Sequence, residues 1–555
     1  MLPALIFYTF LFMALVVIPA GLILVVLLFL EHERRFWKRV TPVIEPIGAM
    51  MGRWPVIRDL RNRFSRTAGF LGRRLDPHDP WGLPGTIAGI GILLGLWFFL
   101  GVLQDIVAKD PLAILNIRLH NTVPLFRTTG MTWFMLAFTQ FGSTTVLSLL
   151  CVGIAVLALA RQQRRVAATF LLALAGTGLV SATLKALVGY ARPIDAIISV
   201  REASFPSGHM LSGTVVYGLL AALLLGSQVR RGVRALGVTL LLLLIVGIGL
   251  SRLYLGVHWP SDLLGSLALA FMVLASLLFF LHYERPVDWI DTFKLPFGSR
   301  ALRIAGSAIV LAAIGAAAVL TIQTEMVPIR PRAVAHSISI QALRISLPSD
   351  LPLGSEDLIG GRMEPISLVF VGTEEDLVRA FTRAGWMRAD LPSPLRVVQE
   401  GLAALQNQPD PAGPATPAYF ADWPQNLTFE KPDTGAPSIR RRHHTRLWKT
   451  AYCVAPNCLP VWVATASFDV GIELSQRLHL PTHRIESAID NERALIVADL
   501  IGVGATQEGS VTVSRPLHGT NAAGDPFSTD GRALVLTMPQ ANAPHTDPTA
   551  TPSFP

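Results

Sequence analysis

Long apolar stretches separated by short polar segments dominate the first 325 positions of the chain. A helix needs about 20 apolar residues to cross the hydrocarbon core of a bilayer. Runs near that length occur at residues 5–30, 86–106, 138–160, 166–188, 208–226, 234–251, 260–281 and 302–322. The pattern predicts a polytopic membrane protein with about eight transmembrane helices.

The polar segments between the runs predict the orientation of these helices. The first run has no basic residue before it and is followed by Arg34, Arg35, Lys38 and Arg39. Basic residues favour the cytoplasmic side, so we expect this helix to start outside and the basic segment 31–85 to be a cytoplasmic linker with interfacial helical stretches. Arginines also cluster at 161–165 and 230–234, which places those loops inside. Residues 109–132 are too polar to cross and are expected along the outer interface.

The chain changes character after about residue 325, where it becomes polar and rich in proline. Short stretches such as Leu459–Phe468 and Ala494–Val503 are strand-like, which predicts a separate soluble α+β domain. The stretch 540–555 is mostly Ala, Pro and Thr and is expected to be a disordered tail. The predicted domains are an N-terminal helix (1–30), a linker (31–85), a membrane core (86–285), a linker with the last helix (286–325), an external domain (326–539) and the tail (540–555).

The composition is typical of a membrane protein, and it does not decide whether Cys453 and Cys458 form a disulfide. Half of the residues (51%) are hydrophobic and 15% are charged, while the net charge is +9. Because the arginines flank apolar runs, we attribute the positive charge to topology and expect no nucleic-acid partner. Among the three cysteines, Cys151 lies in an apolar run and is interpreted as a packing residue. Cys453 and Cys458 either form a small disulfide in an oxidising compartment or remain two thiols.

Three polar clusters interrupt the apolar runs where polar groups are costly. They are Lys185 with Ala191–Pro193, Pro206–His209, and Ser251–Asp262. An ionisable side chain at the centre of a membrane helix costs about 2.5–3.5 kcal/mol, so such groups indicate function. With alternating spans, all three clusters lie at the outer ends of their helices and are expected to converge.

The residue types in these clusters predict a phosphate site. Arg192 and Arg252 each offer a planar fork to phosphate oxygens, and Lys185 adds a point charge. Ser207 and Gly208 lie where a helix begins, and we expect free backbone amides there to bind an anion.

Two histidines are candidates for the chemistry. His258 precedes Asp262 by four residues, so the carboxylate is expected to hold one ring nitrogen and leave the other as a nucleophile. His209 is placed to protonate the leaving group and then to activate water.

Taken together, these three motifs resemble the signatures of the type 2 phosphatidic acid phosphatase superfamily, which also contains vanadium haloperoxidases. The resemblance covers residues 86–285. It implies an all-α six-helix core and a phosphohistidine intermediate on His258, with His209 as general acid and Asp262 as its partner. Because fixed cations meet the phosphoryl charge, we expect a phosphatase that needs no metal or other cofactor. A cage at the outer membrane face suits a lipid phosphate whose tail stays in the bilayer. The implied phosphate ligands are Lys185, Arg192, Ser207, Gly208 and Arg252.

The C-terminal domain carries weaker signals. The segments 372–386 (GTEEDLVRAFTRAGW), 442–448 (RHHTRLW) and 462–493 resemble the LssY-type C-terminal domain, which implies no established activity. Its imidazole and carboxylate groups suit zinc, but their spacing matches no metal motif, so we favour hydrogen-bonded core and surface residues. The residues considered are His443, His444, Asp469, His483 and Asp490.

The leading hypothesis is therefore a multi-pass enzyme of a bacterial-type plasma (inner) membrane, with its active site and C-terminal domain on the periplasmic or external side. Candidate substrates are phosphatidic acid, polyprenyl diphosphate, phosphatidylglycerol phosphate and lipid A. The alternatives are a non-catalytic membrane anchor that displays the C-terminal domain as a binding module, and a vanadate-dependent haloperoxidase.

Overall fold

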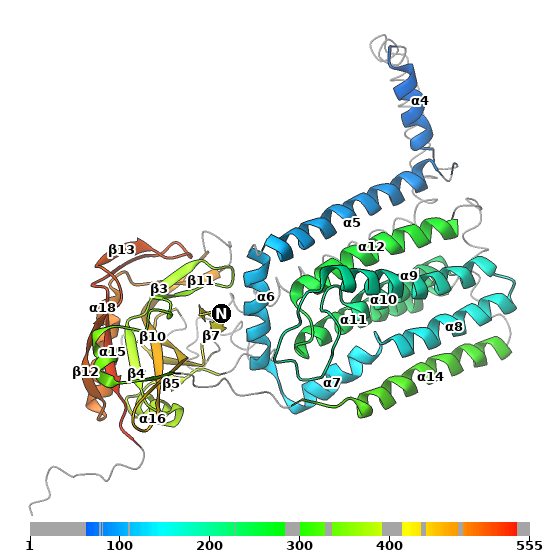
Figure 1. Cartoon of the computed structure of the whole chain (residues 1–555). Helices are drawn as coiled ribbons and strands as arrows, with labels where there is room; N and C mark the ends of the chain where they lie inside the picture. Colours follow the sequence, from blue (N-terminus) through cyan, green and yellow to red (C-terminus); the bar gives the residue numbers. More distant parts are fainter. Residues whose placement is uncertain are drawn as a thin grey trace, which may run out of the picture. The chain divides into compact units, whose positions relative to one another are not determined.

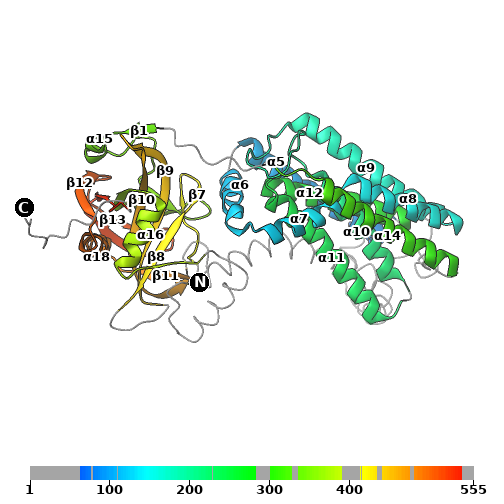
Figure 2. The same ribbon diagram turned by 90° about the horizontal axis from the view of Figure 1, so that it is seen from below.

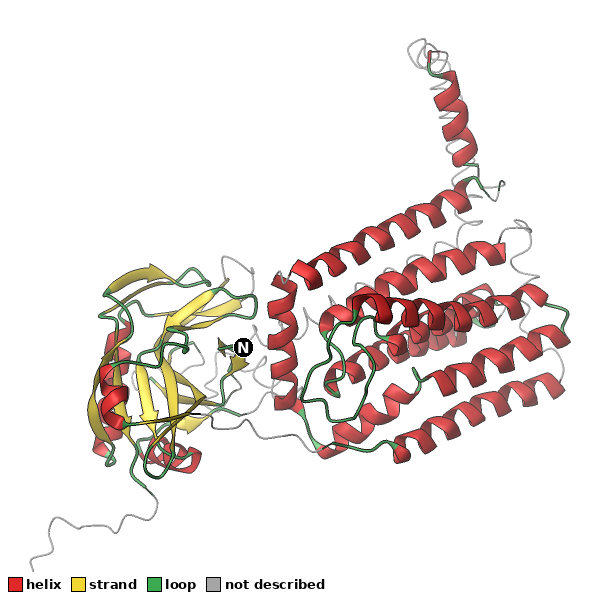
Figure 3. Cartoon of the chain, in the orientation of Figure 1, coloured by secondary structure: helices red, strands yellow, loops and turns green. Residues whose placement is uncertain are grey.

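The computed structural model describes residues 63–76, 79, 81–108, 111–227, 229–282, 300–327, 336–390, 413, 415–433, 440–474 and 481–540. The predicted first helix (5–30), most of the basic linker and the predicted tail from 541 onward lie outside these residues. The described chain forms two compact units. A helical membrane unit comprises residues 63–116 and 127–327, and a strand-rich unit comprises residues 117–126 and 336–540. Figure 3 shows this division into helices and strands.

The membrane unit is a bundle of long apolar helices, as Figure 1 shows. Six helices in the described residues have the length and apolarity to cross a membrane, or seven if the bent pair α7–α8 counts as one span. This confirms the predicted all-α membrane fold. The helices that lie wholly or partly in this unit are α4 (Ser65–Arg74), α5 (Leu83–Ala108), α6 (Pro111–Thr122), α7 (Thr129–Gln140), α8 (Thr144–Ala160), α9 (Arg164–Val188), α10 (Gly208–Gly226), α11 (Arg231–Tyr254), α12 (Pro260–His282) and α14 (Arg300–Gln323).

The third predicted span, 138–160, differs from the structure because the helix is broken. Helices α7 and α8 meet at an angle of 41°. Ser143 starts α8 by accepting a hydrogen bond from Val146 N, which ends the continuous run of α7. Gly142 lies in the break, where a Cβ atom would be 3.1 Å from the backbone oxygen of His209. The break therefore lets the chain approach the start of α10, where one motif lies.

Helix α10 occupies the centre of the bundle and positions the site. It packs against α8, α9, α11 and α12, and most of its side chains are buried. Figure 2 shows α10 among α8, α9, α11 and α12 from a second direction. Helix α11 extends beyond the predicted 234–251 to Tyr254, so Arg252 lies in its last helical turn. The ends of α9, α10, α11 and α12 carry all three motifs.

The strand-rich unit is built on a nine-stranded mixed sheet. Strands β12, β15, β4, β10, β9, β8 and β5 follow one another, while β1 pairs with β9 and β11 with β10. A second sheet has the order β3-β2-β6-β7, and β13 pairs with β14. The bounds are β1 (His336–Ile338), β2 (Gly354–Glu356), β3 (Arg362–Pro365), β4 (Leu368–Val371), β5 (Met387–Arg388), β6 (Tyr419–Phe420), β7 (Trp423–Pro424), β8 (Leu427–Pro432), β9 (Arg442–Val454), β10 (Leu459–Leu474), β11 (Pro481–Ile485), β12 (Thr506–Thr512), β13 (Leu517–Thr520), β14 (Pro526–Thr529) and β15 (Arg532–Thr537).

Helices accompany this sheet and complete the predicted α+β fold. They are α15 (Ile340–Ile345), α16 (Glu374–Arg383) and α18 (Ile489–Gly502). The predicted strand Leu459–Phe468 is confirmed within β10, but the predicted strand Ala494–Val503 is wrong, because these residues lie mostly in α18. Ile496 and Leu500 are buried four residues apart, which is the spacing of one helical face. An apolar run of this length does not by itself distinguish a strand from a buried helix.

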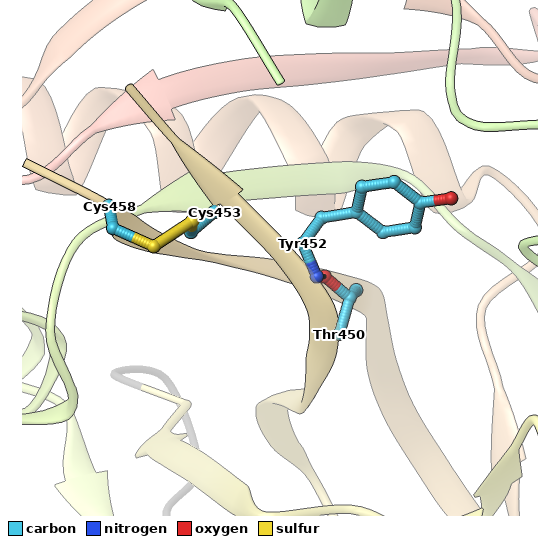
Figure 4. Close-up of a disulfide and its surroundings, with 4 residues drawn as sticks. All are labelled: Thr450, Tyr452, Cys453 and Cys458. Carbon is cyan, nitrogen blue, oxygen red and sulfur yellow. Dashed lines mark hydrogen bonds between the residues drawn. A yellow bond between two sulfur atoms is a disulfide. The ribbon is translucent and has the colours of Figure 1, made fainter. Parts of the chain in front are cut away.

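Cys453 and Cys458 form a disulfide, which resolves the alternative that the sequence left open. They lie on either side of the turn between β9 and β10, as Figure 4 shows. In the same strand, Tyr452 donates a hydrogen bond from its hydroxyl to Asp350 Oδ1 at 2.6 Å. The disulfide closes a short loop and fixes the end of the longest hairpin of this unit.

Residues 117–126 belong to the strand-rich unit although they precede most of the membrane helices in sequence. Arg118 is 4% exposed and donates hydrogen bonds to Glu356 and to Asp422 Oδ1, the latter at 2.9 Å. The Thr122 hydroxyl lies 2.8 Å from the Tyr419 hydroxyl. The sequence predicted only an interfacial position for this segment and gave no indication of these contacts.

Candidate active site

The three motifs lie at four helix ends that face the same region of the bundle. Lys185 is in the last turn of α9, which ends at Gly189 in the left-handed conformation (φ 61°). Ser207 is the N-cap of α10, and Gly208 and His209 are its first residues. Arg252 lies in the last turn of α11, His258 in the next loop and Asp262 in the first turn of α12. Arg192 lies in the loop from α9 to α10.

Asp262 holds the ring of His258. Its Oδ2 atom lies 3.0 Å from His258 Nδ1 and also accepts hydrogen bonds from Trp259 N at 2.9 Å and from the Ser204 hydroxyl. Asp262 is fully buried and His258 is 2% exposed. An ionised carboxylate only accepts, so with Asp262 ionised the proton lies on Nδ1. The Nε2 atom of His258 then keeps its lone pair.

Arg192 faces that lone pair. Its Nη1 atom lies 3.2 Å from His258 Nε2 and also donates to Val257 O. Its Nε donates to Glu202 O at 2.6 Å and its Nη2 to Ala203 O at 3.2 Å. A guanidinium has five N–H groups, so one remains for an anion in this arrangement. Arg192 therefore holds the loop between α9 and α10 as well as offering positive charge. The sequence had predicted a guanidinium with all its donors available to phosphate.

The charges around His258 favour its neutral form. Burial first, and then the nearby charges of Arg252, Arg192, His209 and Lys185, lower the pKa of His258 well below its usual range. A neutral imidazole is the nucleophilic form, because its ring nitrogen is free to form a bond. These charged residues come from all three motifs, so the three motifs lie close enough to interact electrostatically with His258.

Arg252 makes fewer hydrogen bonds to the described residues than Arg192 does. Its Nη1 atom donates to Thr139 Oγ1 at 2.8 Å, while its buried Nε has no hydrogen-bond partner within the described ranges. Leaving a buried polar group unpaired costs about 1–3 kcal/mol. A bound anion would relieve that cost, so Arg252 is the stronger candidate for a two-point contact with phosphate.

Ser207 differs from the sequence-based expectation at its backbone. Its N–H group, predicted to be free for an anion, donates to Ser266 Oγ at 2.8 Å. Its hydroxyl is instead the available group, because the buried Oγ has no partner among the residues that the structure describes. A Cβ atom on Gly208 would lie 3.3 Å from Ser181 Oγ, so this glycine permits close packing of α10 on α9.

Several residues of the site were missed by sequence reasoning. Glu202 pairs with Lys185, and Ser204 contacts both His258 and Asp262. Both lie within seven residues of His209, so their closeness to a motif in the sequence could have predicted a place in the site. Asn116 exchanges hydrogen bonds of 2.8 and 2.9 Å with Ser261, next to Asp262. Its position in a segment interpreted as interfacial gave no such signal.

The pair of Glu202 and Lys185 yields a testable prediction. Glu202 is 72% exposed at its side chain, and the hydrogen bond and charge of Lys185 hold its pKa below the usual range. Because a carboxylate competes with phosphate for Lys185, we expect Glu202→Gln to bind anions about 2- to 5-fold more tightly, as for other exposed ion pairs. The measurement is inhibition by vanadate or inorganic phosphate. The exposed Glu325→Gln variant is the matched control, and weaker anion binding in Glu202→Gln would contradict the prediction.

The residues weighed as a metal site in the C-terminal domain do not converge on one point. His443 pairs with Glu492 at 2.8 Å, whereas Asp490 binds Thr529 and the backbone of Asp530. Only His444 and His483 lie near Asp469. Within the described residues, no group of three or more His, Cys, Asp or Glu residues suits a metal ion.

Comparison with known protein families gives one match in each of the two units. Residues 166–286 match the model of the PAP2 superfamily, and residues 346–533 match that of the LssY C-terminus. The membrane unit carries a PAP2-superfamily domain. This domain contains all eight residues that the sequence singled out for the site, and the strand-rich unit carries the LssY-type C-terminal domain.

Two curated proteins are similar to the PAP2-superfamily domain. “Putative undecaprenyl-diphosphatase YbjG” of Escherichia coli is 37% identical over 111 residues, or 19% of this chain and 52% of that protein. “Decaprenylphosphoryl-5-phosphoribose phosphatase” of Mycobacterium tuberculosis is 38% identical over 95 residues, or 16% of this chain and 47% of that protein. The chain thus spans about half the length of the curated relatives it matches.

Among solved structures, this chain is similar over part of its length to a transmembrane PAP2-type phosphatidylglycerolphosphate phosphatase from Bacillus subtilis. The identity is 24% and the TM-score 0.30, over 34% of this chain and 94% of that one.

Proposed function

We propose that this multi-pass membrane protein is a phosphoric ester hydrolase that removes phosphate from a lipid phosphate or diphosphate. One observation carries the proposal. Asp262 Oδ2 lies 3.0 Å from His258 Nδ1, while His258 Nε2 faces Arg192 among the charges of Arg252 and Lys185. An oriented neutral imidazole surrounded by cations is suited to attack a phosphoryl group.

In the proposed reaction, His258 Nε2 attacks phosphorus and the bond to the leaving oxygen breaks. His209 donates a proton to that oxygen, so an alcohol or a lipid monophosphate departs. Water then attacks the phosphohistidine, His209 takes its proton, and inorganic phosphate leaves with His258 restored. Asp262 keeps the ring oriented in both steps.

The negative charge that develops on the phosphoryl oxygens would be met by fixed cations and donors of this chain. Arg252 offers its unpaired Nε, and the Ser207 hydroxyl is likewise unpaired in the described residues. We therefore propose turnover without a metal. The other proposed phosphate ligands are Lys185, Arg192 and Gly208.

For the substrate we place a polyprenyl diphosphate or a polyprenyl-linked phosphate first. Both curated relatives are named for reactions of polyprenyl phosphates, and a site at the ends of apolar helices suits a headgroup whose tail stays in the bilayer. Phosphatidic acid, phosphatidylglycerol phosphate and lipid A are the competing substrates.

A phosphate-release assay with purified full-length protein tests the proposal. We expect release from at least one of the four lipids that persists in excess EDTA, with polyprenyl diphosphate fastest. Release from none of them would reject the phosphatase and leave a non-catalytic anchor, while bromide oxidation restored by vanadate would identify a haloperoxidase. Activity lost in EDTA and recovered with a metal would reject the metal-free mechanism.

The proposed location of the site makes a separate prediction. We propose that the site and the LssY-type domain lie on the periplasmic or external side of the plasma membrane, where the Cys453–Cys458 disulfide would be favoured. A reporter fused after Leu30 is expected to be cytoplasmic and one after residue 330 external. Alkaline phosphatase and fluorescent-protein fusions report these sides, and the reverse pattern would overturn the orientation.

A further inference from the structure

The LssY-type domain contains a buried polar cluster on one face of its large sheet. Side chains alternate between faces along a strand, so even-numbered residues of β9 share a face with odd-numbered residues of β10. Val463 and Trp448 make this face apolar in one region, but the neighbouring region is polar. Its paired residues are Arg446 with Thr465, His444 with Ser467, and Arg442 with Asp469.

Three residues of this cluster are arranged in sequence as a Ser–His–Asp triad. Ser467 Oγ lies 2.9 Å from His444 Nε2, and His444 Nδ1 lies 3.0 Å from Asp469 Oδ1. A catalytic triad joins the same atoms in the same order. The antiparallel register produces the arrangement, because Ser467 stands directly opposite His444 and Asp469 follows Ser467 on the same face.

Asp469 is held in its charged form. Burial alone would raise its pKa, but the nearby charges of His444, His483 and Arg442 together bring it well below its usual range. Arg442 Nε lies 3.2 Å from Asp469 Oδ2, and Glu430 fixes the same guanidinium at 2.6 Å. When His444 is neutral, an ionised Asp469 favours the tautomer with the proton on Nδ1, and Nε2 then faces Ser467 as a base.

Unpaired buried donors lie beside the triad. Thr465 Oγ1, Arg446 Nε and Ser367 Oγ are buried and have no hydrogen-bond partner in the part of the chain that the structure describes. Thr465 precedes Ser467 by two residues on the same face, and Arg446 stands opposite Thr465. In the PAP2-superfamily domain, the same property marks Ser207 and Arg252. Donors of this kind are what a developing oxyanion requires.

We propose that the LssY-type domain is a second, independent hydrolytic centre that cleaves small carboxylic esters with Ser467 as nucleophile. Ser467 Oγ bonds to the carbonyl carbon while His444 Nε2 takes its proton. The bond to the alkoxy oxygen then breaks, and His444 returns the proton to the leaving alcohol. Water attacks the acyl-serine, His444 takes its proton, and the carboxylic acid leaves as Ser467 Oγ is reprotonated.

The burial of the triad restricts the substrate. Ser467 is fully buried and His444 is 4% exposed, so a compact acyl group is preferred over a long chain. The appropriate probes are p-nitrophenyl acetate for turnover and a small fluorophosphonate for covalent capture of the serine.

The experiment uses the full-length protein in detergent. We expect release of p-nitrophenolate from the acetate ester and phosphonylation of Ser467, located by peptide mass spectrometry. Ser467→Ala and His444→Ala should each lower ester turnover by at least about 100-fold. Ser528→Ala and His518→Ala form a matched control, because these residues are also a cross-strand Ser and His pair, on β14 and β13, and should leave turnover unchanged.

The outcomes separate this centre from the proposed phosphatase. His258→Ala should abolish phosphate release and keep ester turnover, while Ser467→Ala should do the reverse. The proposal is overturned if wild-type protein hydrolyses the ester no faster than Ser467→Ala. It is also overturned if the fluorophosphonate leaves Ser467 of wild-type protein unmodified, a result that needs no variant to fold.

Discussion

Replacing His258 with alanine is expected to reduce phosphate release by about 10³-fold or more, with the protein still folded in the membrane. His258 Nε2 is the only ring atom of this residue left with a lone pair, because Nδ1 is bound to Asp262 at 3.0 Å. In the proposed mechanism, loss of this nucleophile removes the covalent route. Steady-state phosphate release and trapping of ³²P-labelled phosphohistidine are the measurements.

The Asp262→Asn variant tests whether the carboxylate is needed to orient His258. The amide keeps the size of the carboxylate, but it removes the acceptor charge that fixes the Nδ1 proton of His258, so we expect turnover to fall by about 100-fold or more. His518→Ala is the control, because this histidine is exposed in the strand-rich unit. Normal turnover in either His258→Ala or Asp262→Asn would reject the assigned roles.

Replacing Arg252 with alanine is expected to weaken binding of phosphate and vanadate by about 10- to 100-fold. Its buried Nε has no partner among the described residues, and its Nη1 is fixed by Thr139. A hydrogen bond to a charged group contributes about 1.5–3 kcal/mol, which corresponds to this range. The inhibition constant for vanadate measures the effect directly, and KM for the lipid should rise in parallel.

Three further variants test whether the loss of anion affinity is due to the planar guanidinium of Arg252. Arg252→Lys keeps the charge but loses the planar geometry, so its affinity should lie between wild type and Arg252→Ala. Arg192→Ala should lower kcat as well as affinity, because Arg192 also binds three backbone carbonyls around His258. The exposed Arg161→Ala should change neither. An Arg252→Ala protein with unchanged vanadate inhibition would remove Arg252 from the anion site.

The two hydrolytic centres proposed here differ in how they are built. In the PAP2-superfamily domain, the ends of four helices present side chains from motifs spread over 78 positions, from Lys185 to Asp262. In the LssY-type domain, two adjacent strands place Ser467, His444 and Asp469 by register alone. If both are active, one chain hydrolyses phosphoric and carboxylic esters at separately inactivated sites.

The sequence alone predicts the apolar spans that the structure describes, apart from the break between α7 and α8, and the motifs that they carry. A span is a local property, because its length follows from the rise per residue and the thickness of the bilayer. Alternation of spans then places the ends of α9, α10, α11 and α12 together without knowledge of packing. For this reason the sequence alone identifies Lys185, Arg192, His209, Arg252 and His258 as candidates for one site.

Only the tertiary structure decided which donors in those motifs are available. The Ser207 amide is occupied by Ser266, Arg192 donates to backbone carbonyls, and Glu202 pairs with Lys185. The tertiary structure also decided that residues 489–502 form the helix α18, because their apolar side chains pack against the sheet. It likewise decided the contact between Ser467 and His444, which are 23 residues apart in the sequence. Such contacts depend on register, packing and competition between partners, which are non-local and leave no periodic pattern in the chain.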